Sequence, residues 1–412
     1  MADRPLNILA LACFNTGDRF IERCKERGAR VWLLTKETYL QKKPWRRDLL
    51  EDIFAERDDT PLQKTIDTVS YLARSIRFDR IIPFDDVEVD AAAHLREHLR
   101  VPGMGDTRAR VFRDKLAMRV RAEEEGFPVP AYVGVLHYDD IRAFTERVPP
   151  PWMLKPRTEA SSTGIRKIES SGELWAAIHQ LGDRASHFLL EQYLPGDVHH
   201  VDSIVTEGKV VFTEVHRNGV PPFDVSHAGG VFSTYTVERT SADWQQLAAL
   251  NEQILTRFGL LRGTAHLEFI KRRSSEPSAS SGSAYGDFYF LEAGARVGGA
   301  HVADVVEAAT GVNLWSEWAD IEIDKGTVPY VLPPRREQYA GLIQCLARTE
   351  HPDLSRYDDG EVVYRVPDPY HAGLVVRSPG HARVRELLDA YARRFADDFL
   401  AVLPHYELPP QR

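Results

Sequence analysis

The sequence predicts a mixed α/β and α+β protein whose N-terminal domain is built around a parallel sheet. Two observations predict this class. Over the first hundred residues, short apolar runs alternate with helical segments, which is the order expected of parallel strands joined by crossover helices. Beyond residue 150, apolar runs with strand-like alternation come in neighbouring pairs, which is typical of hairpins. A chain of 412 residues is long enough for two to four subdomains with a sizeable core.

The N-terminal elements follow in a regular order. Residues 6–12 predict a buried strand, which is followed by a turn and a helix that reaches about residue 26. Gly28 ends that helix, and residues 29–35 predict a second strand. Residues 80–83 predict a further strand, with a helix over 89–99. The first turn lacks a G-x-G-x-x-G pattern, so the sequence does not support a dinucleotide site.

The later elements are separated by polar loops. A helix that contains Lys115 ends at Gly126, and residues 152–156 and 188–194 predict short strands. Residues 198–205 and 209–215 predict a hairpin across a Glu-Gly turn. The Ser-rich stretch 272–286 predicts a mobile surface connection. An amphipathic helix over about 384–399 lies near the end of the chain.

The composition is that of an ordinary soluble globular protein, with 43% hydrophobic and 27% charged residues. The net charge of −9 argues against a general nucleic-acid binder. Cys13, Cys24 and Cys345 are scattered without paired metal spacing, so we expect reduced thiols and a cytoplasmic protein. The sequence shows neither a secretory leader nor a membrane span, and we expect no membrane partner.

Two glutamates in neighbouring predicted strands are the main candidates for a metal site. Glu268 lies in the strand-like segment 263–270 and Glu292 in the segment 288–299. In an antiparallel hairpin both carboxylates would lie on one face, and we expect Phe290 to share that face with Glu292. Two carboxylates this close repel each other unless a cation lies between them, and Mg²⁺ suits such ligands. Exposed strand glutamates are nevertheless common, so the pair alone does not establish a metal site.

Other motifs suit a nucleotide. Lys155 ends an apolar strand and precedes a loop of small hydroxyl residues that ends at Gly164, so a lysine charge and backbone N–H donors could hold phosphates. Glu191 begins a strand exit that could meet an adenine ring, and Asp197 could accept bonds from ribose hydroxyls. A surface lysine and an ordinary turn are the simpler readings of each motif taken alone.

The ordered set of motifs resembles the ATP-grasp superfamily from residue 1 to at least 325. The resemblance implies that ATP is clamped between two α+β subdomains, with one or two Mg²⁺ ions on Glu268 and Glu292 and Mn²⁺ as an alternative ion. Gly294 stands where the family often has a metal-binding asparagine, so the number of ions stays open. The predicted ATP contacts are Lys115, Lys155, Ser161, Ser162, Thr163, Gly164, Glu191, Gln192, Tyr193, Leu194 and Asp197.

The same resemblance implies the domain organisation. Residues 1–105 would form a pre-ATP-grasp domain with a Rossmann-like parallel sheet, and residues 106–190 the small lid subdomain. Residues 191–330 would form the large subdomain that carries the metal and substrate site. Residues 331–412 would form a C-terminal α+β segment that packs on the large subdomain.

The reactive end of the site is expected just after the second glutamate. Arg296 is the predicted catalytic residue, because a fixed guanidinium can stabilise charge on phosphoryl oxygens. Gly298 and Gly299 are expected to open a helix over 300–309 whose free N–H groups favour a substrate carboxylate. Further predicted substrate contacts are Arg217, Asp224 and His227, the last two at a spacing that resembles L-amino-acid ligases.

The resemblance implies an ATP-dependent carboxylate–amine ligase that acts through an acyl phosphate, with dipeptide synthesis by an L-amino-acid ligase preferred. Its partners would be a small carboxylic acid and an amine, and a homodimer is possible. A bicarbonate-activating enzyme similar to biotin carboxylase is one alternative, although the Arg-x-Gln-x-Glu pattern of such enzymes is missing after Arg296. A non-catalytic nucleotide-binding protein of the same fold is the other.

Overall fold

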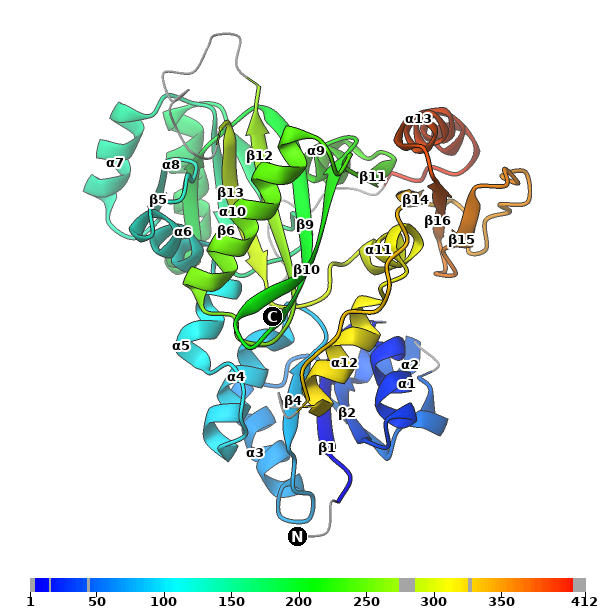
Figure 1. Ribbon diagram of the computed structural model, residues 1–412. Helices are drawn as coiled ribbons and strands as arrows, with labels where there is room; N and C mark the ends of the chain where they lie inside the picture. The colour runs from blue at the N-terminus through cyan, green and yellow to red at the C-terminus, as the bar shows by residue number, and fades with distance from the viewer. Residues whose placement is uncertain (1–3, 15, 43–44, 274–285, 325–327, 403–412) are drawn as a thin grey trace.

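The computed structural model describes residues 4–14, 16–42, 45–273, 286–324 and 328–402. Within these ranges the chain forms three sheets (Figure 1). Clusters of buried apolar side chains pack on each of them. No helix among the described residues is long and apolar enough to cross a membrane. Most of the Ser-rich connection predicted over 272–286 lies outside the described residues.

The N-terminal sheet is parallel and has the order β3-β2-β1-β4, which confirms the predicted class of this region. The turn from the first strand into the first helix needs a glycine: Gly17 has φ +93°, and a Cβ there would lie 2.2 Å from the Phe84 ring. The elements are β1 (Asn7–Ala12), α1 (Asp18–Glu26), β2 (Arg30–Lys36), α2 (Glu37–Lys42), β3 (Asp52–Glu56), α3 (Leu62–Leu72), β4 (Arg80–Pro83) and α4 (Glu88–Leu99).

The second sheet is small and antiparallel, with the order β5-β8-β6-β7. Two helices bury its apolar face, where Trp152, Leu154 and Leu190 are almost fully enclosed. This part of the chain consists of α5 (Asp106–Ala109), α6 (Lys115–Glu124), β5 (Tyr132–Gly134), α7 (Tyr138–Arg147), β6 (Trp152–Pro156), β7 (Arg166–Ile168), α8 (Ser171–Leu181) and β8 (Phe188–Gln192).

The third sheet is antiparallel and has the order β13-β12-β9-β10-β11-β14-β16-β15. The strands after residue 331 extend the same sheet as the strands before it, so both belong to one hydrogen-bonded unit. Its elements are β9 (Gly196–Thr206), β10 (Lys209–Asn218), α9 (Pro222–Ala228), β11 (Phe232–Thr236), α10 (Ala242–Phe258), β12 (Gly263–Arg272), β13 (Phe288–Gly294), α11 (Val302–Thr310), α12 (Leu314–Asp324), β14 (Tyr339–Leu346), β15 (Val362–Arg365), β16 (His371–Ser378) and α13 (His381–Asp398).

Helix α12 joins the large sheet to the N-terminal domain (Figure 1). It packs against α1, where the rings of Phe20 and Trp318 meet edge to face at 5.7 Å. Arg23 of α1 also forms an ion pair with Asp320 at 2.9 Å. The loop between β4 and α4 also contacts the large-sheet part of the chain, because its Asp86 bonds Arg296, which follows β13.

Candidate active site

Glu268 and Glu292 are direct cross-strand partners in the antiparallel pair β12–β13, which agrees with the predicted hairpin that places both carboxylates on one face. The predicted face of Phe290 is wrong. The register skips Leu291, so a β-bulge separates Phe290 from Glu292 and reverses their relation. Phe290 is fully buried and packs on Phe269, on the side opposite the two half-exposed carboxylates.

Each carboxylate of the pair has a cationic neighbour. The Nζ atom of Lys115 lies 2.9 Å from Oε1 of Glu292 and donates a second bond to the carbonyl oxygen of Glu159 at 2.7 Å. The Nε2 atom of His266 lies 3.6 Å from Oε1 of Glu268. Burial raises the pKa of Glu268, but His266 outweighs it and the net pKa is lowered. A pair of carboxylates of this kind fits a divalent cation such as Mg²⁺.

Arg296 lines the same cavity as Glu268 and Glu292, and its guanidinium is held from two sides. Its Nη1 donates to the carbonyl oxygen of Val297 at 2.8 Å, and its Nη2 donates to Oδ2 of Asp86 at 2.5 Å. Burial raises the pKa of Asp86, yet Arg296 outweighs it, so the pKa is lowered and the carboxylate is charged. A Cβ at Gly294 would lie 3.2 Å from Oδ1 of Asp86, so the glycine leaves room for this carboxylate. Sequence reasoning missed Asp86, which lies 210 residues from its partner.

Lys155 is fixed at the cavity wall by a buried carboxylate. Its Nζ lies 2.5 Å from Oε2 of Glu191, whose Oε1 lies 2.7 Å from Nη2 of Arg119. Arg119 is fully buried, and it also donates to the carbonyl oxygen of Leu291, the bulge residue, at 2.5 Å. The Glu191 carboxylate therefore pairs with both Arg119 and Lys155 and is not free to bond the adenine ring. The backbone N–H groups of Gln192 and Tyr193 also have partners already, since they donate to the carbonyl oxygens of Ala131 and Pro151.

Glu191→Gln is expected to lower the free energy of unfolding by about 3–5 kcal/mol. Arg119 would keep its buried charge without a partner carboxylate, which is more costly than losing the whole pair. Urea unfolding followed by fluorescence measures the change. Glu252→Gln, an exposed change on α10, serves as the control and should stay within about 0.5 kcal/mol. Equal stability of the two variants would contradict a stabilising role for the buried carboxylate.

These side chains surround a cavity of about 420 Å³ between the small and the large sheet. Ser161 and Ser162 of the loop after β6 line it, and both are in the left-handed region, with φ +56° and +57°. Backbone turns of this kind can direct successive N–H groups at an anion. The further predicted residues that line the cavity are Thr163, Gln192, Tyr193, Leu194, Asp224 and Gly299.

In the described part of the chain, five predicted residues are not among those that line the cavity: Gly164, Asp197, Arg217, His227 and Gly298. Asp197 forms ion pairs with Arg217, at 2.8 Å, and with Arg273, so the predicted ribose and substrate contacts neutralise each other. The Nε2 atom of His227 lies 2.8 Å from the carbonyl oxygen of Ile165, which links α9 to the small sheet. The predicted helix after Gly299 begins later than expected, at Val302.

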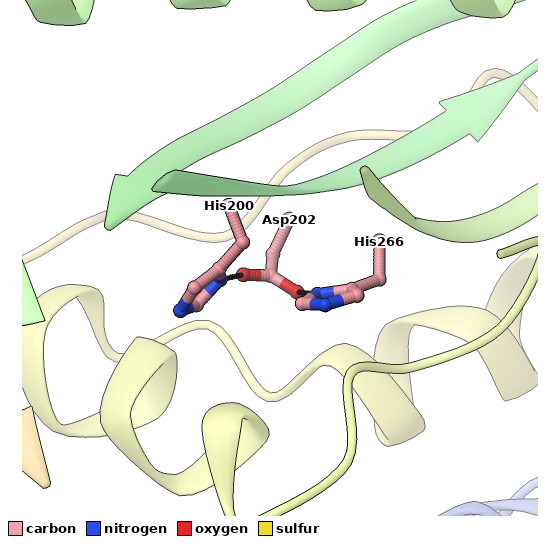
Figure 2. Close-up of side chains that lie close together, drawn as sticks. All are labelled: His200, Asp202 and His266. Atoms are coloured by element: carbon pink, nitrogen blue, oxygen red, sulfur yellow. Dashed lines mark hydrogen bonds and ion pairs between the residues drawn. The ribbon is translucent and has the colours of Figure 1, made fainter. Parts of the chain in front are cut away.

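Figure 2 shows a cluster of His200, Asp202 and His266 that the sequence did not reveal. It adjoins Glu268 through His266. The fully buried Asp202 lies between two imidazoles, with its oxygens 2.8 Å from Nδ1 of His200 and 2.9 Å from Nδ1 of His266. The Nε2 atom of His200 reaches Oγ1 of Thr234 at 2.8 Å. Each Nδ1 is aimed at its own carboxylate oxygen, so the three groups form a hydrogen-bonded row.

The charges in this cluster are unequal. Burial lowers the pKa of His200 to about 4. Burial also acts to lower the pKa of His266, but Asp202 outweighs it and the pKa is raised to about 9. Burial opposes ionisation of Asp202, yet the imidazoles hold its pKa well below the usual range. His266 is thus the charged imidazole, and it is the one beside Glu268. His199 faces the other way, onto the ring of Phe288.

Comparison with known proteins agrees with this geometry. Residues 148–278 match the family model of the ATP-grasp domain. The solved L-amino acid ligase from Bacillus licheniformis superposes with a TM-score of 0.75 at 16% identity, covering 97% of this chain and 99% of that one. This chain has the ATP-grasp fold. The α/β and α+β classes predicted from the sequence, with the N-terminal parallel sheet, are those of this fold.

Curated relatives of this ATP-grasp chain include two ligases. The L-arginine-specific L-amino acid ligase of Bacillus subtilis is 21% identical over 275 residues, which is 63% of this chain and 63% of the relative. Carnosine synthase 1 of Gallus gallus is 29% identical over 255 residues, 56% of this chain and 24% of the relative. The chain thus spans less than two thirds of the length of either relative, and it resembles L-amino-acid ligases.

Proposed function

We propose that this protein is an ATP-dependent carboxylate–amine ligase that joins an amino acid or another small carboxylic acid to an amine. The observation that carries the proposal is the meeting of five charged groups at one cavity: the opposed carboxylates of Glu268 and Glu292, the lysines Lys115 and Lys155, and Arg296. Lysines suit ATP phosphates and a carboxylate pair suits Mg²⁺, while an arginine suits the oxygens of a phosphorylated acid.

Each group has a separate part in the reaction. Lys115 and Lys155 neutralise phosphate oxygens, and Glu268 and Glu292 hold one or two Mg²⁺ ions, or Mn²⁺ in their place. When bound, the metal would act as a Lewis acid and offset the negative charge that develops during phosphoryl transfer. Arg296 directs its guanidinium at the oxygens of the acyl phosphate. Because Asp86 and Val297 fix that guanidinium in advance, little reorganisation is needed during the reaction.

The proposed chemistry has two steps. A carboxylate oxygen of the acid attacks the γ-phosphorus, and the bond from that phosphorus to ADP breaks, which gives an acyl phosphate. The amine nitrogen then attacks the acyl carbon, the bond to the phosphate oxygen breaks, and the amine proton is released with the departing phosphate. Water must be kept from the acyl phosphate. The bond from His227 to Ile165 would help by closing α9 onto the small sheet.

The acceptor of the phosphoryl group separates this proposal from bicarbonate activation. Arg296 is followed by Val297, Gly298, Gly299 and Ala300. The glutamine of the Arg-x-Gln-x-Glu pattern is therefore missing, and so is the glutamate that acts as a base in carboxylases of this fold. Gly299 and Ala300 line the cavity and leave space for an acid larger than bicarbonate. A purely nucleotide-binding role is the less favoured reading, because both glutamates and Arg296 are retained around the cavity.

One assay tests the proposal: phosphate release from Mg-ATP, measured with pairs of amino acids, with single acids and amines, and with bicarbonate. We expect release that requires both an acid and an amine, and mass spectrometry should detect the amide product. Release that depends on bicarbonate would contradict the ligase. ATP binding without release across the whole panel would favour the nucleotide-binding reading.

A further inference from the structure

The side chains behind Glu268 form a continuous polar row across three strands. Asp202 of β9 is the cross-strand partner of His266 of β12, and His200 is the partner of Glu268. Glu268 in turn is the partner of Glu292 in β13. Because neighbouring residues on one face of a sheet lie close together, the row ends at the two carboxylates that face the cavity.

Within this row, one end of the His266 ring is fixed and the other faces Glu268. The Nδ1 atom lies 2.9 Å from Oδ1 of Asp202, and the Nε2 atom lies 3.6 Å from Oε1 of Glu268. Asp202 cannot move aside easily, because it is fully buried and also bonds His200 at 2.8 Å (Figure 2). The bond to Asp202 therefore decides where the Nε2 atom of His266 is directed.

The segment after Arg296 closes over the same pair. A Cβ at Gly298 would lie 2.8 Å from Oδ1 of Asp202 and 2.9 Å from Nδ1 of His266, so the backbone passes in close contact with both groups. A glycine is required there for steric reasons, since any side chain would collide with the hydrogen bond. This contact explains the first glycine of the Gly-Gly pair, and it further restricts the His266 ring.

We propose that Asp202 and His266 are positioning residues that hold the Glu268 carboxylate ready for a divalent cation. The inference rests on the proposed metal role of Glu268 and Glu292. A carboxylate whose rotation is restricted loses less conformational freedom when it binds a metal, and groups that orient metal ligands typically change metal affinity about 10–100-fold when they are removed. Neither residue needs to touch the nucleotide or the substrates for this effect.

The test measures metal binding without turnover. Mn²⁺ is titrated into the protein with ADP, and free Mn²⁺ is followed by electron paramagnetic resonance. We expect Asp202→Asn and His266→Gln to weaken Mn²⁺ binding about 10–100-fold. His199→Gln is the matched control, because His199 is buried on the same strand as Asp202 but faces the other side of the sheet, and it should bind Mn²⁺ as the wild type does. ADP affinity measured in EDTA should be the same in all four proteins.

The outcomes separate this inference from the proposed function. Failure of the wild type to bind Mn²⁺ with ADP would overturn the metal site itself. Tight binding by the wild type and by both positioning variants would overturn only the role of Asp202 and His266. An equal loss of ADP affinity in EDTA would also overturn it, since that result marks general damage to the fold. His266 is partly exposed and Asp202 is fully buried, so the His266→Gln result decides if Asp202→Asn does not fold.

Discussion

Glu292→Gln is expected to reduce ADP formation in the presence of acid and amine by about 10³-fold or more, with the fold retained. The amide removes one of the two charges that hold the metal, and it leaves Lys115 without the carboxylate that lies 2.9 Å from its Nζ. Metal stabilisation of phosphoryl charge amounts to several kcal/mol, which corresponds to a rate factor of this size. A coupled assay for ADP measures the rate, and Mn²⁺ titration with ADP measures binding.

The matched control for this variant is Glu252→Gln, the same exchange at an exposed position of α10. It should leave both the rate and Mn²⁺ binding unchanged. Thermal unfolding of Glu292→Gln should resemble that of the wild type, because Glu292 is partly exposed at the cavity. Turnover at the wild-type rate in Glu292→Gln would remove the metal role from this carboxylate and with it the main support for the proposed function.

The position of the carboxylate pair could be predicted because it depends on local pattern. Strand alternation and the order of the two strands are enough to predict a hairpin with Glu268 and Glu292 on one face, and in the structure the two residues are paired. The β-bulge at Leu291 was not predictable in the same way, since an inserted residue leaves no mark in the alternation. It is stabilised by a contact from elsewhere, the bond from Arg119 of α6 to the carbonyl oxygen of Leu291.

The ion pairs around the site could not be predicted, because their partners come from distant elements. Asp86 reaches Arg296 from the N-terminal domain across 210 residues of sequence. Glu191 was expected to contact the adenine ring. In the structure its buried carboxylate forms ion pairs with Arg119 of α6 and with Lys155. A sequence shows which side chains can carry charge near a site, but the pairing of those charges depends on how the sheets are assembled.

Arg296→Lys is expected to lower kcat about 10²–10³-fold while the KM for ATP changes less than about threefold. A lysine keeps the positive charge, but one ammonium cannot bond Asp86 and the Val297 carbonyl and still present a planar donor face to the cavity. The loss should therefore fall on the step in which charge develops on the acyl-phosphate oxygens. Steady-state rates at saturating acid and amine, with ATP varied, separate the two constants.

Asp86→Asn tests whether the N-terminal domain takes part through Arg296. The asparagine keeps the shape of Asp86 but removes the charge that fixes the guanidinium, so we expect a smaller fall in kcat than Arg296→Lys gives. If Asp86 acts only by orienting Arg296, the two substitutions should be strongly non-additive, and Asp86→Asn should cost little more once Arg296 is a lysine. Additive losses would mean that Asp86 affects the reaction by a separate route. The interdomain ion pair at 2.5 Å would then be a structural contact and not part of the reactive arrangement.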